Sequence, residues 1–249
     1  MIRAAATLAA ALALASAPAA AATTTFGAAH EIEHLDTGGN WDRTVVSLER
    51  RGGKHRSLLL EWRSIGRFDV RDDEFALGAH APLTDGAGLA IEFSGAADPA
   101  IVPELAMRLD LDIKLSRGLV GHVIGRRASY PEDTTTGFGG GLEYYFGAWR
   151  LAYEAIATSL KQGDSGTAHI AHTDWYYGDE NRVGLVAAFG DEATRLSPDA
   201  VIVTDVRSAA LAGRHWPHPR WGVTWAASWT EQGDFHTRTG GTLGILFHF

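Results

Sequence analysis

The chain has 249 residues, no cysteine and a formal net charge of −8 at pH 7. This charge, with no visible basic patch, excludes nucleic acid as a partner. Without disulfides, stability must come from burial and strand pairing. The length suits one domain, because barrels and sandwiches of about 200 to 250 residues often form a single unit.

The first 22 residues, MIRAAATLAAALALASAPAAAA, carry one positive charge, an Ala/Leu-rich run and small residues suited to cleavage. This pattern predicts a secretory signal peptide over 1–22 and a mature domain over 23–249 that lies outside the cytoplasm. Beyond this segment, no stretch approaches the roughly 18 consecutive apolar residues of a spanning helix. The mature chain is therefore not expected to be a helical membrane protein.

From about residue 31 onward, segments of eight to thirteen residues alternate in polarity, with pieces rich in Gly, Pro, Asp and Asn between them. In ELAMRLDLDIKLSRG, odd positions 105 to 115 are apolar, and the even positions from 108 to 114 are charged. A strand separates these sets onto two faces, whereas a helix would scatter them. The pattern predicts up to fourteen strands, at 29–36, 42–51, 56–66, 73–81, 87–95, 104–115, 118–129, 137–146, 149–160, 167–176, 181–190, 200–212, 220–230 and 237–249. The first and the twelfth are the least regular, so twelve strands stay open as an alternative.

The apolar face could lie inside a soluble barrel or sandwich, or it could contact lipid. A bilayer draws aromatic side chains to its two interfaces, whereas a protein core places them without regard to depth. Here aromatic residues gather where the apolar faces reach strand ends, which favours a membrane-interface girdle. Its members are Trp62, Phe75, Tyr144, Phe146, Trp149, Tyr176, Trp221, Trp229, Phe247 and Phe249.

Lipid also requires closure, because an unpaired strand edge in hydrocarbon costs several kcal/mol. The sequence therefore predicts an all-β fold, a transmembrane antiparallel up-and-down β-barrel of 12–14 strands in the outer membrane of a Gram-negative bacterium. The final GGTLGILFHF is expected to be the closing strand, with its odd-numbered apolar residues against outer-membrane lipid. An alternating strand that ends at Phe249 resembles the signal by which the barrel-assembly machinery recognises such proteins.

The opposite face carries charged residues that are expected to line the lumen. They could line an aqueous path for ions, or they could pair across neighbouring strands and fill a narrow interior. Pairing with residual water is the favoured interpretation, since it needs no further assumption. The candidates are Glu74, Glu92, Arg108, Asp110, Asp112, Lys114, Arg126, Glu143, Arg150, Glu154 and Arg182.

Other clusters give no defined chemistry. The acidic run over 69–73 falls at an expected exterior connection, where such residues are usually solvated. Ser94, Ser129, Ser159 and Ser228 could approach His80 or His122, but nothing in the sequence orders them into a triad. The spacing of the His30/His34, His169/His172 and His215/His218 pairs matches no closed zinc site. No metal, cofactor or catalytic residue is predicted.

The stretch RFDVRDDEFALGAHAPL, with Arg67-Phe68-Asp69 followed by Asp72-Asp73, resembles the Arg-Phe…Asp region of the YaiO family of outer-membrane β-barrel proteins. The ending, WGVTWAASWTEQGDFHTRTGGTLGILFHF, is similar to the C-terminal strand pair of that family. The resemblance implies an outer-membrane barrel, and it supplies no catalytic residues. Some longer members of that family look fused to helical repeats of a type common in envelope polysaccharide machinery. This sequence shows no such repeats before residue 29, so the resemblance gives little support to a direct role in polysaccharide export.

The leading functional hypothesis is a narrow passive pore or a structural barrel of the cell envelope, with small solutes or envelope polysaccharide as its candidate ligands. An outer-membrane hydrolase directed at lipid or peptide is the first alternative. A soluble periplasmic ligand-binding barrel is the second.

Overall fold

The computed structural model describes residues 22–53, 55–131, 133–161, 163–178, 180–197 and 200–249. Almost all of the predicted signal peptide lies outside these residues. The described chain forms fourteen strands. They are β1 (Thr23–Leu35), β2 (Asn40–Gly52), β3 (Arg56–Arg67), β4 (Val70–Thr84), β5 (Ala87–Ala96), β6 (Leu105–Ser116), β7 (Leu119–Ser129), β8 (Thr134–Phe146), β9 (Trp149–Leu160), β10 (Ser165–Tyr177), β11 (Asn181–Ser197), β12 (Ala200–His218), β13 (Trp221–Gln232) and β14 (His236–His248).

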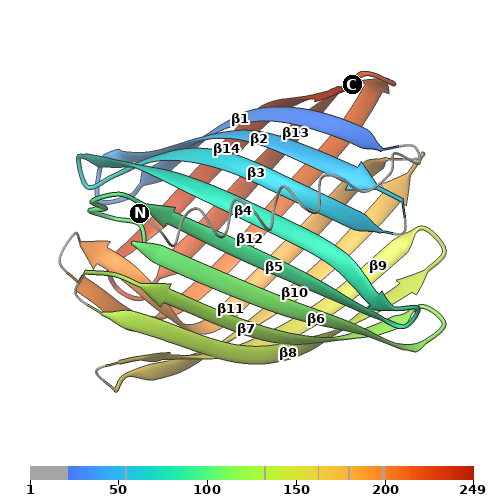
Figure 1. Ribbon diagram of the computed structural model, residues 1–249. Helices are drawn as coiled ribbons and strands as arrows, with labels where there is room; N and C mark the ends of the chain where they lie inside the picture. Colours follow the sequence, from blue (N-terminus) through green and yellow to red (C-terminus); the bar gives the residue numbers. More distant parts are fainter. Residues whose placement is uncertain (1–21, 54, 132, 162, 179, 198–199) are drawn as a thin grey trace.

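Each strand pairs antiparallel with its neighbours in sequence, and β1 pairs with β14, so the sheet is a closed up-and-down barrel. The closing register runs from Thr25 opposite His248 to Leu35 opposite Arg238. The strands tilt strongly relative to the barrel axis (Figure 1). The predicted fold class is confirmed, and the strand number is fourteen rather than twelve.

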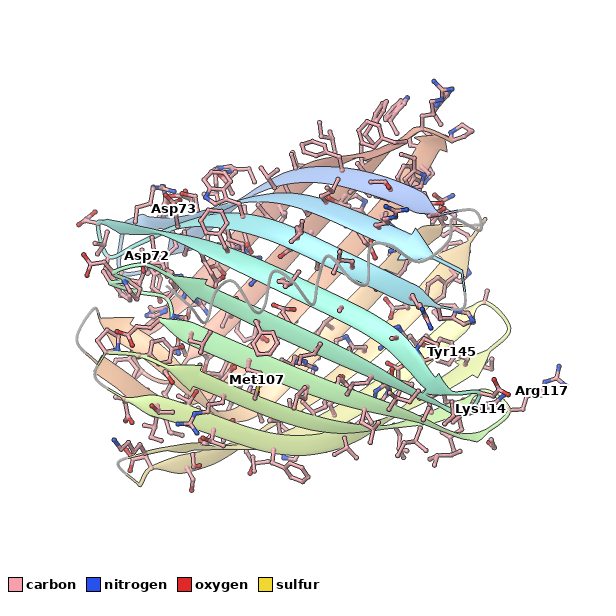
Figure 2. The ribbon with its side chains drawn as sticks, viewed as in Figure 1. Asp72, Asp73, Met107, Lys114, Arg117 and Tyr145 are labelled. Carbon is pink, nitrogen blue, oxygen red and sulfur yellow. The ribbon has the colours of Figure 1, made fainter. Side chains whose placement is uncertain are left out.

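The two ends of the barrel differ. The start of β1 and the C-terminus lie together, because the Phe249 N–H donates to the Thr24 carbonyl oxygen at 3.0 Å. With an even number of strands, the β6–β7 turn falls at this same end, which we call the terminal end. Figure 2 shows Lys114, Arg117 and Tyr145 there, and Asp72 and Asp73 at the opposite end, which we call the loop end. In barrels of this kind the short turns and both chain termini face the periplasm.

Several strands extend beyond their predicted limits. The sequence predicts a connection over 190–199, but β11 continues to Ser197 and β12 begins at Ala200. The expected turn at 213–219 is also mostly strand, since β12 reaches His218. Between β3 and β4 only Phe68 and Asp69 remain, both with positive φ (54° and 59°). Two consecutive positive φ values make a tight hairpin turn whose twist matches that of the flanking strands.

Glycines on the inner face of β8 let neighbouring side chains lie flat against that strand. A Cβ at Gly137 would be 2.6 Å from Arg126 Cγ, and one at Gly139 would be 2.8 Å from Ile156 Cγ1. Side chains from β7 and β9 therefore cover β8 from the inside. Glycine in a strand commonly marks such a close approach, as the GFGGG sequence suggests.

The outer face is apolar and exposed, as a lipid-facing surface should be. Phe75, Phe138 and Leu243 are 66%, 68% and 75% exposed. In contrast, the inward-facing Ile124 and Ile156 are almost fully buried. Among the described residues, none belongs to a helix long and apolar enough to cross a bilayer.

Candidate functional site: the charged lumen

The structure places all the predicted lumen residues on the inner face. Pairing register shows this, because residues directly opposite one another in a sheet share a face. Asp112 lies opposite His122 on β7, and Glu143 lies opposite the buried Ala152 on β9. By the same alternation the inner face holds Glu74, Glu92, Arg108, Asp110, Lys114, Arg126, Arg150, Glu154 and Arg182.

The first group of paired charges crosses three strands near the loop end. Arg63 Nη1 lies 3.1 Å from Glu74 Oε2, and Arg63 Nη2 lies 3.2 Å from Glu92 Oε1 and 2.5 Å from Glu61 Oε2. Ser94 Oγ donates to Glu74 Oε1 at 2.7 Å. One guanidinium therefore joins carboxylates of β3, β4 and β5. Arg63 was not among the predicted lumen residues. Its position next to Trp62, which was predicted to face lipid, could have assigned it to the inner face.

A second group lies toward the terminal end. Arg150 binds Glu143, and its Nη1 donates to Asp174 Oδ2 at 2.8 Å. The Tyr145 hydroxyl donates to Glu143 Oε2 at 2.6 Å, and Arg182 Nε lies 3.6 Å from Asp174 Oδ1. These groups connect β8, β9, β10 and β11. Such partly buried charges are stabilised by pairing, and removal of one partner leaves the other unpaired.

A third group occupies the wall between the other two. His122 contacts Asp110, Asp112 and Glu143, and Arg108 Nη2 lies 3.3 Å from Asp110 Oδ2. Arg108 also approaches Glu154 Oε2 at 3.9 Å. His122 therefore joins carboxylates of β6 and β8. Alternation predicts that these side chains share the inner face, but it does not predict that they touch.

Water reaches much of this lumen face. The side chains of Arg108, Glu92 and Arg182 are 44%, 38% and 42% exposed, although all three point inward. A cavity of about 250 Å³ lies beside Glu92, Arg108, Arg126 and Glu192. The Arg126 Nη2 group donates to Thr158 Oγ1 along its wall. The interior therefore combines ion pairs with accessible space beside them.

Most of the predicted interface aromatics lie on the outer face. Trp62, Phe75, Tyr144, Phe146, Trp149, Trp221, Trp229, Phe247 and Phe249 occupy the same face as the apolar residues. Tyr176 does not, and its prediction is wrong. It lies opposite Arg182 and shares the inner face with Asp174. Trp175 and Tyr177 take the outward positions instead, with ring centroids 4.8 Å apart.

The acidic run at the loop end has a structural role. Asp72 is 7% exposed, and its carboxylate accepts backbone N–H groups of Ala100, Ile101 and Val102 at 2.7 to 3.1 Å. Ile101 and Val102 also pack against the inward Ile65. The expectation of a solvated loop cluster is wrong for Asp72, which lies on β4 and anchors the β5–β6 loop at the barrel mouth.

Loss of this anchor is expected to release the β5–β6 loop. In the Asp72→Ala variant, the loss of hydrogen bonds to a charged acceptor costs about 1.5–3 kcal/mol, so the opened population should rise at least about tenfold. Limited digestion with a broad-specificity protease should then cut within 97–104 at least about tenfold faster. Asp73→Ala, which changes the exposed neighbour on the outer face, is the control. Equal cutting rates for both variants would contradict the assignment.

Ser94, His80 and His122, which were considered for a hydrolase triad, have other partners in the structure. Ser94 is bound to Glu74, and His80 Nδ1 lies 2.7 Å from the His55 carbonyl oxygen. His122 is held by carboxylates. These side chains are therefore engaged in the barrel wall.

Solved structures similar to this one are outer-membrane barrels. The CymD monoaromatic hydrocarbon channel matches with a TM-score of 0.61 and 10% identity, over 92% of this chain and 88% of that one. Omp33 of Acinetobacter baumannii gives a TM-score of 0.54 at 12% identity, over 91% and 99%. An anion-selective porin from Comamonas acidovorans gives 0.51 at 10% identity, over 92% and 99%. At these identities the likeness shows the fold alone.

No curated protein matches the sequence. The model of the YaiO membrane beta barrel domain matches residues 23–194, which include the RFDVRDD stretch. The C-terminal strand pair, which also resembles that family, lies outside the matched residues. Membership of a membrane-barrel family overturns the alternative of a soluble periplasmic barrel. A closed barrel with an apolar outer face, a charged lumen and this family match identifies the chain as an outer-membrane β-barrel protein that belongs to the YaiO family.

Proposed function

We propose that the protein is a narrow, water-filled pore that lets small ions and solutes cross the outer membrane passively. The observation that carries this proposal is the exposure of Arg108, Glu92 and Arg182, since water reaches charged groups on the inner face. A lumen filled only by packed side chains would leave such groups dry. Charged rings and walls of this kind govern which ions enter a pore.

The size of the barrel supports a narrow path. Eight strands leave room only for side chains, and sixteen to eighteen leave an aqueous channel, so fourteen fall between these cases. The path is narrowed further by ion pairs between neighbouring strands on the inner face, and by the inward side chains of Ile124 and Ile156. The conductance should therefore be below that of a general porin.

The proposed pore should prefer cations mildly, because the chain carries a formal charge of −8. Planar-bilayer recording of the purified barrel, with a chelator present, tests both conduction and selectivity. The proposal predicts discrete steps and a reversal potential on the cation side. A correctly folded barrel that never conducts under varied salt and voltage would instead leave the structural barrel as the function.

Neutralising Glu92 should reduce this preference. A unit charge about 7 Å from a passing ion contributes about 0.6 kcal/mol in a water-like dielectric, a factor of about two to three. Because the same charge disfavours an anion by an equal amount, the cation-to-anion permeability ratio of Glu92→Gln should fall about sevenfold, read from the reversal potential in a salt gradient. Asp73→Asn, on the outer face, should leave the ratio unchanged. If both variants match the wild type, Glu92 does not face the ion path.

We further propose that residues 1–22 direct export, and that the barrel-assembly machinery recognises the β14 strand through Phe249. Phe249 is 75% exposed, and its side chain lies on the outer face. Deleting Phe249 should lower the amount of folded barrel in outer-membrane fractions severalfold. Phe138→Ala removes a similarly exposed outward ring (68%) and should not. Equal amounts in both variants would argue against recognition through the terminal residue.

A further inference from the structure

The third lumen group brings together side chains that could coordinate a metal ion. One ligand atom from each of Asp110, Asp112 and His122 lies within 4.8 Å of the others. His122 Nδ1 is 2.8 Å from Asp112 Oδ1 and 3.3 Å from Asp110 Oδ1. The register explains this, because Asp110 and Asp112 share the inner face of β6, and His122 lies directly opposite Asp112 on β7.

We propose that this group is a binding site for a divalent transition-metal ion of the zinc type, with His80 as the fourth ligand. The proposal concerns binding alone, so it holds whether or not the barrel conducts ions. The four residues come from β4, β6 and β7, and all of them face the lumen.

The tautomer of His80 suits a metal ligand. Its Nδ1 lies 2.7 Å from the His55 carbonyl oxygen, which can only accept a hydrogen bond, so Nδ1 carries the proton and donates. In the neutral ring Nε2 then keeps its lone pair, and it lies 3.5 Å from Asp112 Oδ2. Metal-binding histidines commonly donate their second ring N–H to a backbone carbonyl in this way.

Gly88 on β5 leaves the space in which His80 meets Asp112. The strand β5 lies between β4 and β6, so a side chain at Gly88 would stand between the two. A Cβ there would be 2.8 Å from His80 Nε2 and 3.5 Å from Asp112 Oδ2. The absence of a side chain at this position therefore lets a histidine of β4 reach the β6 carboxylates.

The burial of His122 supports the same site. Its side chain is 10% exposed, and its Nε2 atom is buried without a hydrogen bond. Glu143 Oε1 lies 3.4 Å from this nitrogen. With a metal on Nδ1, Nε2 carries a proton directed toward Glu143, which is the carboxylate–histidine–metal arrangement found around bound zinc.

The distances from His122 to its two carboxylate neighbours are near those of a zinc site. Zinc lies about 2.0–2.2 Å from nitrogen and oxygen ligands, so two ligands of a tetrahedral site are about 3.3–3.6 Å apart. The 3.3 Å between His122 Nδ1 and Asp110 Oδ1 falls in that range, and the 2.8 Å between His122 Nδ1 and Asp112 Oδ1 needs a small opening. His80 Nε2 lies 3.5 Å from the other oxygen of Asp112 and outside the group of three, so His80 must move toward the other ligands when the ion binds. Two imidazole nitrogens and two carboxylate oxygens form a donor set suited to zinc.

Titration of the full-length folded barrel with Zn²⁺ alone, followed by calorimetry, tests the proposal. Wild type should bind one ion per barrel, and His122→Ala and Asp112→Asn should weaken that binding at least about tenfold. His172→Ala removes a different lumen-facing histidine, opposite Ala152, and should bind as wild type does. Heat-modifiable gel migration verifies that each variant is folded.

His80→Gln supplies a second, milder variant that should also weaken Zn²⁺ binding. X-ray absorption at the zinc edge should show two nitrogen ligands from histidine in wild type and one in this variant. The proposal is overturned if folded wild type binds no Zn²⁺, or if His122→Ala and His80→Gln bind it as tightly as wild type. Bilayer conductance does not enter this test, so its failure is distinct from failure of the pore.

Discussion

Replacement of Gly139 by valine is expected to prevent the barrel from folding. A Cβ at Gly139 would lie 2.3 Å from the Ala155 carbonyl oxygen and 2.8 Å from Ile156 Cα, so the β8 and β9 backbones would have to separate. Overpacking ordinarily costs about 1–3 kcal/mol. Here backbone atoms on both strands must move, which also breaks ladder hydrogen bonds. After refolding in detergent, Gly139→Val should give no heat-modifiable folded band.

Gly125→Val is the matched control. Gly125 lies on the outer face of the adjoining strand β7, and a Cβ there meets no atom within 4 Å. This variant should fold with a wild-type yield, since valine is favourable in strands and on a lipid-facing surface. Folding of Gly139→Val with the wild-type yield would contradict the close contact between β8 and β9.

Substitution of Leu243 by arginine is expected to destabilise the inserted barrel by about 2–4 kcal/mol, the cost of a lipid-facing cation near the bilayer midplane. Leu243 is 75% exposed on β14. It lies midway between Phe247, near the terminal end, and Thr239, which pairs with Trp229 toward the loop end. Equilibrium unfolding in urea, with the barrel inserted in lipid vesicles, measures the change in free energy.

The neighbouring position provides the control for this effect. Thr242 faces the lumen opposite Glu31, so an arginine introduced there has water and a carboxylate within reach. Thr242→Arg should change the unfolding free energy much less than Leu243→Arg. Equal destabilisation by the two variants would mean that the odd-numbered residues of β14 do not contact lipid.

The lumen combines two properties that compete. Paired charges such as Arg63 with Glu74, and Arg150 with Asp174, fix neighbouring strands to one another. Exposed groups such as Arg108 remain in contact with water. Surface-like pairs contribute little and buried pairs are costly to break. In the proposed pore, the exposed groups would therefore influence ion entry, while the buried pairs hold the wall together.

Alternating polarity assigns the two faces of most strands before any tertiary contact is known. Polarity with period two is a local property, so Asp110, Asp112 and Lys114 could be assigned to the lumen, and Leu243 to lipid, without knowledge of their partners. Counting these segments gave twelve to fourteen strands, and the structure has fourteen. The same reasoning failed at Tyr176, because Trp175-Tyr176-Tyr177 offers an aromatic residue to either face.

Which charges meet depends on strand register, which the local pattern does not give. His122 lies beside Asp112 because of the register of β6 with β7, and His80 reaches the same carboxylate across Gly88. Asp72 binds the backbone of a loop almost thirty residues away. Register, curvature and loop position arise from contacts between segments far apart in the chain. Closure was predicted from the sequence, but the register of β1 with β14 was not.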